Sequence, residues 1–252
     1  MLLDTQILSY AYKGRAIAID GAKISSVTAH EFFEIYDRGS LTRFRYYIKY
    51  LRGHYHSARP RSSPAEEKTG RLERIYLDFG SDHPKVIEFN SHATAAIIND
   101  RNIPAFAGVT STLSRRRKKK LRSQFAFLCN QRIACIPLQA ATAELGAQLL
   151  WKFSQTNNIK AGDEGKFRNS INDMMILATA ITAREQLRTD DKLLAQFAAT
   201  LPHAQLKELD ADMVEITFRQ ESVTDAFHAQ ESKGYVNRGW RIATDLRRTP
   251  IT

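Results

Sequence analysis

Helical and strand-like segments alternate along most of this chain, and this alternation restricts its fold more than its composition does. Residues 1–3 are apolar and predict a short buried strand, and residues 5–14 follow with helical spacing. Further strands are predicted at residues 23–27, 132–138 and 186–189, each followed by a helical pattern. Strands that alternate with helices are typical of an α/β fold, so we expect a mainly parallel central sheet flanked by helices.

One long segment, residues 41–114, does not follow this alternation. It is rich in Arg, Tyr, His, Ser and Pro, and residues 71–79 and 85–90 have the composition of two strands joined by a turn at residues 80–84. We therefore divide the chain into a discontinuous α/β domain, an insertion with a β-hairpin, and a polar C-terminal tail of little regular structure. Their predicted boundaries are 1–40 with 115–218, 41–114 and 219–252.

Charge and composition narrow the class of partner. The chain has 252 residues, and its 37 Lys and Arg against 27 Asp and Glu give a formal charge of +10, which favours an anionic partner such as nucleic acid or a lipid surface. Its two cysteines are too few for a disulfide framework, which indicates a reducing compartment and a cytoplasmic protein. Residues 1–12 lack the pattern of a secretory signal, and no segment approaches the roughly 20 apolar residues that span a bilayer, so no membrane partner is expected.

Four acidic residues fall where the predicted elements begin or end. Asp4 and Asp191 follow predicted strands, Glu31 lies in the first turn of the second helix, and Asp173 lies near the start of the apolar helix at residues 171–181. A single acid at such a position is usually a helix cap or a partner of the helix dipole. Four acids at the carboxyl edge of one sheet, where α/β folds bind their ligands, predict a functional site.

The chemistry of such a cluster points to a divalent cation. Converging carboxylates repel one another, so three or four ionised acids are costly to hold together unless a cation lies among them. Ligands that are all oxygen select hard ions, here Mg²⁺ or Mn²⁺, over zinc, which prefers His and Cys. An ion of this kind can polarise a phosphodiester and lower the pKa of a bound water molecule, so that no side-chain nucleophile is required.

Three stretches around these acids resemble a known family, the PIN-domain nucleases, and within it the VapC-like toxin ribonucleases. Residues 2–9 (LLDTQILS) are similar to the opening strand, acid and hydroxyl residue of the family, and residues 24–32 (ISSVTAHEF) to its strand-to-helix glutamate segment. More specific is the Asp-led apolar helix at residues 172–181 (NDMMILATAI), followed by LRTDD at residues 187–191, which resembles the closing Thr-x-Asp. This spacing makes Asp191, rather than Asp190, the match for the fourth acid.

The resemblance implies a fold, an activity and a set of residue roles. It implies a PIN-like fold and a metal-dependent endoribonuclease that hydrolyses RNA phosphodiester bonds, of the kind found as the toxin of a toxin–antitoxin pair. An antitoxin protein and a homodimer are the partners that it implies beside the RNA substrate. Asp4 and Asp173 are the implied primary metal ligands, and Glu31 and Asp191 are implied ligands or water-orienting groups. The hydrogen-bonding residues implied behind these acids are Thr5, Thr189 and Asp190.

A dense run of basic residues begins at residue 115. Seven cations occupy eight consecutive positions and start a predicted helix that continues through residues 125–128. The run is either a solvated helix face or a surface that contacts nucleic-acid phosphates, and both alternatives stay open. Its basic members are Arg115, Arg116, Arg117, Lys118, Lys119, Lys120 and Arg122.

Two other classes of protein remain alternatives. A non-catalytic nucleic-acid-binding or assembly protein would keep a PIN fold and use its basic insertion as the working surface, although the presence of all four acids favours an enzyme. An unrelated α/β enzyme is disfavoured, because the sequence has no Gly-rich phosphate loop, no nucleophile-elbow serine motif and no zinc-protease helix.

Overall fold

The computed structural model describes residues 1–37, 42–45, 75–78, 87–89, 91–111, 113–157, 164–209, 213–218 and 241–243. Its helices are α1 Thr5–Tyr12, α2 Ser26–Phe32, α3 Ser91–Asn99, α4 Ile103–Val109, α5 Arg115–Asn130, α6 Ala140–Asn157, α7 Glu164–Ala183 and α8 Lys192–Ala199. Its strands are β1 Leu2–Leu3, β2 Lys23–Ser25, β3 Glu34–Asp37, β4 Thr42–Arg45, β5 Ile75–Asp78, β6 Ile87–Phe89, β7 Ala134–Ile136, β8 Leu187–Thr189, β9 Ala204–Glu208, β10 Val214–Phe218 and β11 Arg241–Ala243. Among these residues, no helix has the length and apolar character needed to cross a bilayer.

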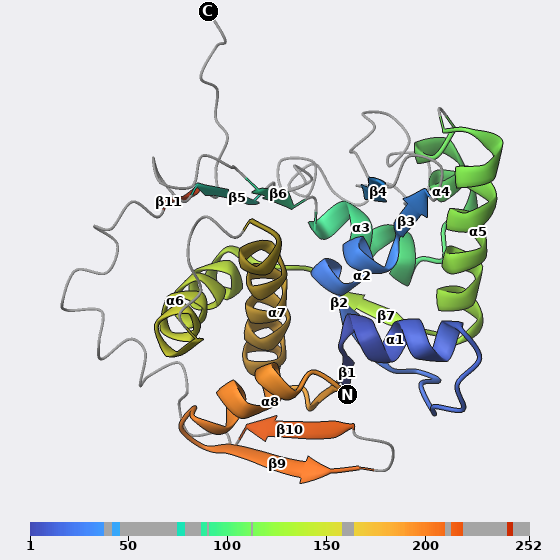
Figure 1. Cartoon of the computed structure of the whole chain (residues 1–252). Coiled ribbons are helices and arrows are strands. Elements are labelled where there is room, and N and C mark those ends of the chain that lie inside the picture. Colours follow the sequence, from blue (N-terminus) through green and yellow to red (C-terminus); the bar gives the residue numbers. More distant parts are fainter. Residues whose placement is uncertain are drawn as a thin grey trace, which may run out of the picture.

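A six-stranded sheet forms the centre of the molecule (Figure 1). Its strand order is β7-β2-β1-β8-β10-β9; the first four strands run parallel, whereas β10 and β9 are antiparallel to their neighbours. The fold is therefore α/β, but the expectation of a mainly parallel sheet is wrong, because the sheet is mixed. Only residues 209–213 separate β9 from β10, and strands joined by so short a connection pair antiparallel.

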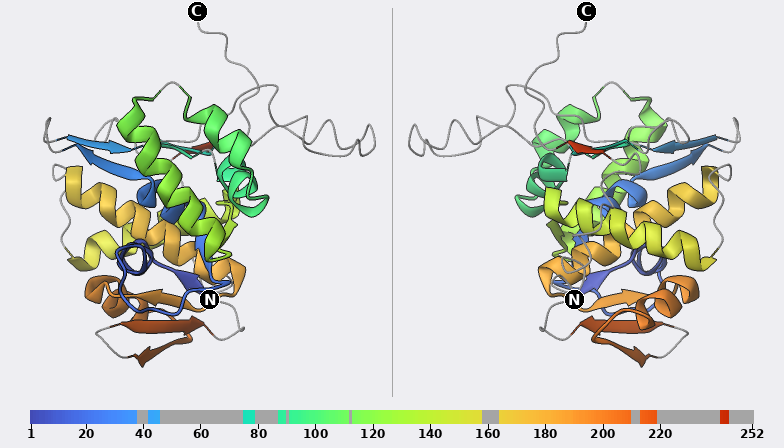
Figure 2. Two further views of the ribbon diagram at one scale, coloured as in Figure 1. Left: turned by 90° about the vertical axis from the view of Figure 1, so that its right-hand side faces the viewer. Right: turned by 90° about the vertical axis from the view of Figure 1, so that its left-hand side faces the viewer.

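Two apolar clusters, one on each face of the sheet, hold the helices in place. Leu2 belongs to the cluster that includes residues of α6, α7 and α8, and the next residue, Leu3, to the cluster that includes residues of α1, α3 and α5. Successive side chains of a strand point to opposite faces, so these two leucines join both helical layers. In Figures 1 and 2 the β9–β10 pair lies at the end of the molecule away from α3 and α4.

Polar side chains fix the starts of the helices that follow β1, β2 and β8. Asp4 caps α1, Ser25 caps α2 and Asp191 caps α8, each with a side-chain oxygen that accepts a hydrogen bond from a backbone N–H of the first turn. Such caps satisfy backbone donors that have no partner within the helix. These caps therefore hold the starts of α1, α2 and α8 next to the carboxyl ends of the strands that precede them.

Two helices begin earlier in the chain than their patterns predict. α2 begins at Ser26, so Glu31 lies near its end and not in its first turn. α7 begins at Glu164 and continues through Gly165, a residue that usually weakens helices, so Asp173 lies in its middle and not near its start. Neither acid therefore lies at the start of its helix, and neither is positioned as an N-terminal cap.

Strands and core helices also occur within the segment expected as an insertion. β3 pairs antiparallel with β4, and β5 with β6; the expected turn at residues 80–84 lies outside the described residues. β11 pairs antiparallel with β5, although regular structure was not expected in the C-terminal tail. α3 and α4 contribute Ala93, Ile97, Ile98 and Phe106 to the apolar cluster shared with α1 and α5. Part of the expected insertion therefore belongs to the core of the α/β layers.

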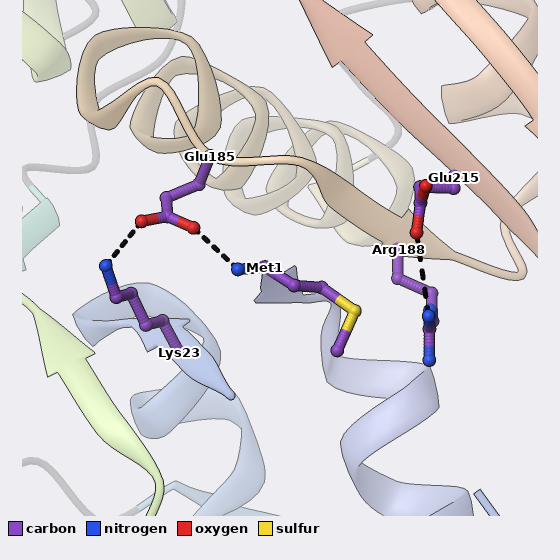
Figure 3. A network of polar contacts seen from close by, with 5 residues as sticks. All are labelled: Met1, Lys23, Glu185, Arg188 and Glu215. Atoms are coloured by element: carbon purple, nitrogen blue, oxygen red, sulfur yellow. Dashed lines mark hydrogen bonds and ion pairs between the residues drawn. The ribbon is translucent and has the colours of Figure 1, made fainter. Parts of the chain in front are cut away.

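Ion pairs tie together the amino ends of β1, β2 and β8 (Figure 3). Glu185 accepts a hydrogen bond from the amino group of Met1 at 2.6 Å and from Nζ of Lys23 at 2.5 Å. Partial burial alone would raise the pKa of Glu185, but these two cations lower it below 4.5. Arg188 of β8 pairs with Glu215 of β10 at 3.5 Å. The contacts of Glu185 lie at the amino ends of these strands, whereas the acidic residues gather at the carboxyl ends of β1 and β8.

Candidate functional site

The carboxyl ends of β1 and β8 lie side by side and bring two acids to one edge of the sheet. The strands are parallel neighbours, and the backbone N–H of Asp4 donates to the carbonyl oxygen of Arg188 at 3.0 Å. Asp4 and Asp191 therefore start α1 and α8 from the same edge. α2 and α7 pack against each other beside it and supply Glu31 and Asp173.

Asp4 is the buried centre of this group. Its side chain is 3% exposed; Oδ1 accepts a hydrogen bond from the backbone N–H of Thr5 at 2.6 Å, and Oδ2 accepts one from the hydroxyl of Thr189 at 2.7 Å. The pKa of Asp4 is raised from 3.8 to about 7, chiefly by burial; the charges of Glu31 and Asp191 add to the rise and the two hydrogen bonds oppose it. This carboxyl group therefore resists ionisation unless positive charge is supplied.

Glu31 is held at both of its carboxylate oxygens. The hydroxyl of Thr5 donates to Oε2 at 2.6 Å, and Nδ2 of Asn172 donates to Oε1 at 2.6 Å. Thr5 thus binds two acids, because its backbone N–H also donates to Asp4. Asn172 is 5% exposed, and no role for it was expected from the sequence. An amide directly before Asp173, at the start of an apolar run, is the signal that could have revealed it, since a buried polar group requires a partner.

Asp173 interacts with all three other acids through its charge. Its pKa is raised well above 3.8, first by burial and then by the charges of Asp4, Glu31 and Asp191. Like charges that lie close together disfavour ionisation of each member of a group. The structure therefore brings the four sequence-predicted acids close enough to repel one another.

Thr189 links the two acids that follow the parallel strands. Its hydroxyl donates to Asp4 and accepts a hydrogen bond from the backbone N–H of Asp191 at 3.0 Å. Oδ1 of Asp191 is occupied in capping α8, since it accepts from the backbone N–H of Leu194 at 3.0 Å. Asp190 lies partly exposed between these residues, and within the described chain no hydrogen bond joins its side chain to the acids.

The donor chemistry of this site fits a hard divalent cation. The acids offer only oxygen, and positive charge among them would offset both the burial and the mutual repulsion that raise the pKa values of Asp4 and Asp173. In the part of the chain that the structure describes, no group of three or more His, Cys, Asp or Glu side chains is arranged to hold a metal ion. The four acids are thus neighbours that interact through their charges, and not an assembled ligand shell.

α5 passes the end of α1 that is far from Asp4 (Figure 1), and Lys120 of the basic run reaches that end. Nζ of Lys120 lies 4.7 Å from the ring centroid of Tyr12, and the hydroxyl oxygens of Tyr12 and Ser123 are 2.9 Å apart. α1 has 8 residues and is therefore about 12 Å long, with Asp4 at its other end. Most cations of the run are exposed to solvent. The exposed ones are Arg115, Arg116, Lys119, Lys120 and Arg122.

Comparisons with known proteins do not assign this chain to a family. No family model matches it, and no match was found among curated proteins or among solved structures. A functional assignment therefore depends on the chemistry of the site itself.

Proposed function

We propose that this chain is a metal-dependent endoribonuclease of the PIN-domain type, in which Asp4, Glu31, Asp173 and Asp191 hold Mg²⁺ or Mn²⁺. One observation supports it above the others: Asp173 is buried, and the charges of three other acids from three separate elements of the fold add to the rise that burial causes in its pKa. Acids that serve only as helix caps do not have to lie near one another. Four that converge despite their repulsion are best explained by a cation that binds among them.

The residues have distinct tasks in this proposal. Asp4 and Asp173, the two acids with raised pKa values, bind the ion, and Glu31 and Asp191 bind it or orient a water molecule beside it. Thr189 and Thr5 fix the direction of the Asp4 carboxylate. When bound, the ion would polarise the phosphodiester and make the coordinated water a stronger nucleophile.

The test is cleavage of total RNA by the purified full chain with Mg²⁺, Mn²⁺ or EDTA. We expect cleavage with either ion and none with EDTA, and Asp4→Asn or Asp173→Asn to lower the rate by about 100-fold or more. Both variants should fold, because each removes like charge from the cluster. Asp100→Asn, which changes an exposed acid after α3 in the same way, should cleave like the original protein.

Two results would reject the proposal. If Asp4→Asn or Asp173→Asn keeps full metal-dependent activity, the acids do not hold a catalytic ion. If the original protein cleaves equally well in EDTA, the reaction needs no divalent cation.

A second candidate is a non-catalytic nucleic-acid-binding protein, and the start of α5 favours it. Positive charges in the first turn oppose the helix dipole, and the side chain of Ser114, the N-cap residue, makes no capping hydrogen bond. An anion bound there would relieve both disadvantages. This candidate predicts that the protein binds RNA tightly while Asp4→Asn changes neither binding nor the integrity of the RNA.

The resemblance to toxin ribonucleases adds two proposed partners, a small antitoxin protein and a second copy of the chain. Light scattering on the purified protein tests the second of these, since a monomer at micromolar concentration would reject the homodimer.

A further inference from the structure

The buried amide of Asn172 makes a contact that the stability of its own helix does not require. In α7 the neighbouring residues 174–178 are apolar or small and fully buried. Another buried polar residue of α7, Thr179, bonds within the helix, because its hydroxyl donates to the carbonyl oxygen of Met175 at 2.7 Å. Asn172 instead donates to Glu31 on α2, which is 141 positions away in the sequence. Its partner belongs to the acidic site.

This contact determines where the Glu31 carboxylate points. A glutamate side chain has three rotatable bonds before its carboxylate, so one hydrogen bond leaves it free to rotate about that contact. Thr5 binds Oε2 and Asn172 binds Oε1, both at 2.6 Å and from different elements. Two donors on two oxygens fix the plane of the carboxylate, and each oxygen keeps a lone pair for a further partner.

We propose that Asn172 is a positioning residue that holds Glu31 in the orientation needed to bind a divalent cation together with Asp4 and Asp173. The inference rests on the metal site of the proposed function. A neutral donor suits this position, because it orients one acid without adding a fifth negative charge beside Asp173.

The experiment measures binding of Mn²⁺ alone, without RNA, from the rise in melting temperature of the full chain as Mn²⁺ is titrated. We expect Asn172→Ala to weaken the apparent affinity by about 10-fold or more, the usual effect of removing a residue that orients a metal ligand. Thr179→Val, which removes a buried polar group from the same helix, should leave the affinity unchanged. If Asn172→Ala does not fold, the same Mn²⁺ titration is made on Asn172→Leu, which replaces the amide by an apolar side chain of similar size.

A double-mutant cycle separates positioning from a merely structural role. In a Glu31→Ala background, replacement of Asn172 should cause no further loss of Mn²⁺ affinity, because the residue through which it acts is gone. The inference would be overturned if Asn172→Ala and the original protein bound Mn²⁺ with equal affinity. It would also be overturned if replacing Asn172 lowered the Mn²⁺ affinity as much in the Glu31→Ala background as in the original protein. If the original protein binds Mn²⁺ but does not cleave RNA, the proposed function fails and the inference stands; if it binds no Mn²⁺, both fail.

Discussion

Asp4 and Asp191 both cap helices, yet their surroundings give them different properties. The side chain of Asp191 is partly exposed and bonds to the first turn of α8, a contact that accounts for it in ordinary structural terms. Asp4 is buried, and its second oxygen accepts from Thr189 on a neighbouring strand. Burial and nearby acids raise its pKa to about 7. The protonation state of Asp4 therefore changes near neutral pH.

The pKa of Asp4 predicts how the stability of the metal-free protein depends on pH. The folded value of about 7 lies above the ordinary 3.8, so the folded state binds more protons than the unfolded state between these values. The free energy of unfolding should therefore fall as pH rises from 4 to 7, by at most about 4 kcal/mol for this group. Asp4→Asn should lack this contribution, which urea unfolding in EDTA at several pH values would measure.

A buried histidine, His30, also makes stability depend on pH, so the original protein must be compared with Asp4→Asn. Burial lowers the pKa of His30 from 6.5 to about 4, so its contribution to stability is lost as pH falls through the same range. Its effect is opposite in sign to that of Asp4 and is present in both proteins, so the difference between them reports Asp4 together with Asp173, whose pKa the charge of Asp4 helps to raise. Parallel pH profiles for the original protein and Asp4→Asn would show that the carboxyl group ionises normally.

At the scale of elements, the close packing of α6 against α7 determines where Asp173 lies. Gly146 of α6 faces Met175 of α7, and a Cβ at position 146 would stand 2.5 Å from the sulfur of Met175 and 3.4 Å from its Cα. The two helices approach this closely because position 146 has no side chain. Met175 is two residues from Asp173, so this close contact lies near the acid along α7.

Gly146→Ala should therefore destabilise the protein even though alanine favours helices. Alanine gains up to about 1 kcal/mol of helix propensity, but displacing Met175 costs about 1–3 kcal/mol, for a net loss of about 1 kcal/mol. Gly108 of α4 is the matched control: a Cβ at position 108 would have nothing within 4 Å, so Gly108→Ala should stabilise by about 0.5–1 kcal/mol. Urea unfolding measures both, and stabilisation by Gly146→Ala would contradict this explanation.

The sequence predicts the elements around the site better than it predicts their contacts. The strands that precede Asp4 and Asp191 and the helix at residues 192–199 follow from local patterns, because apolar period and capping are properties of neighbouring residues. The antiparallel pairing of β10 with β8 and the contact of Asn172 with Glu31 depend on residues that lie further apart in the chain. A pattern in one segment contains no information about which other segment will meet it.

For the molecule as a whole, charge is divided between two regions. The acids lie at the start of α1, and the basic run of α5 reaches the end of the same helix through Lys120 and Tyr12. A polyanion therefore meets favourable charge on α5 at one end of α1, about 12 Å in length, and an acidic site that would repel it without a cation at the other end. In the proposed function, the basic run supplies affinity and the acidic site supplies chemistry.

Neutralising part of the basic run should lower RNA affinity and its dependence on salt. We expect Arg116→Gln with Lys119→Gln to reduce the slope of log affinity against log salt by up to about 1.4, the value for two lost phosphate contacts to single-stranded nucleic acid. Lys192→Gln with Lys207→Gln removes the same charge from exposed positions on α8 and β9 and is the control. RNA affinity is measured by fluorescence anisotropy at several salt concentrations. If the two double variants have the same slope of log affinity against log salt, the basic run is only a solvated helix face.

The hydrogen bond between Thr189 and Asp4 joins residues 185 positions apart. The ribosome synthesises Asp4 long before Thr189. For much of synthesis the growing chain therefore contains Asp4 without Asp173 and Asp191 beside it. In the proposed function, the emerging chain therefore cannot cleave the messenger being translated until residues 189–191 have left the ribosome and docked beside Asp4. Any nuclease activity would then begin only with the completed fold, a built-in delay that requires no separate inhibitor during synthesis.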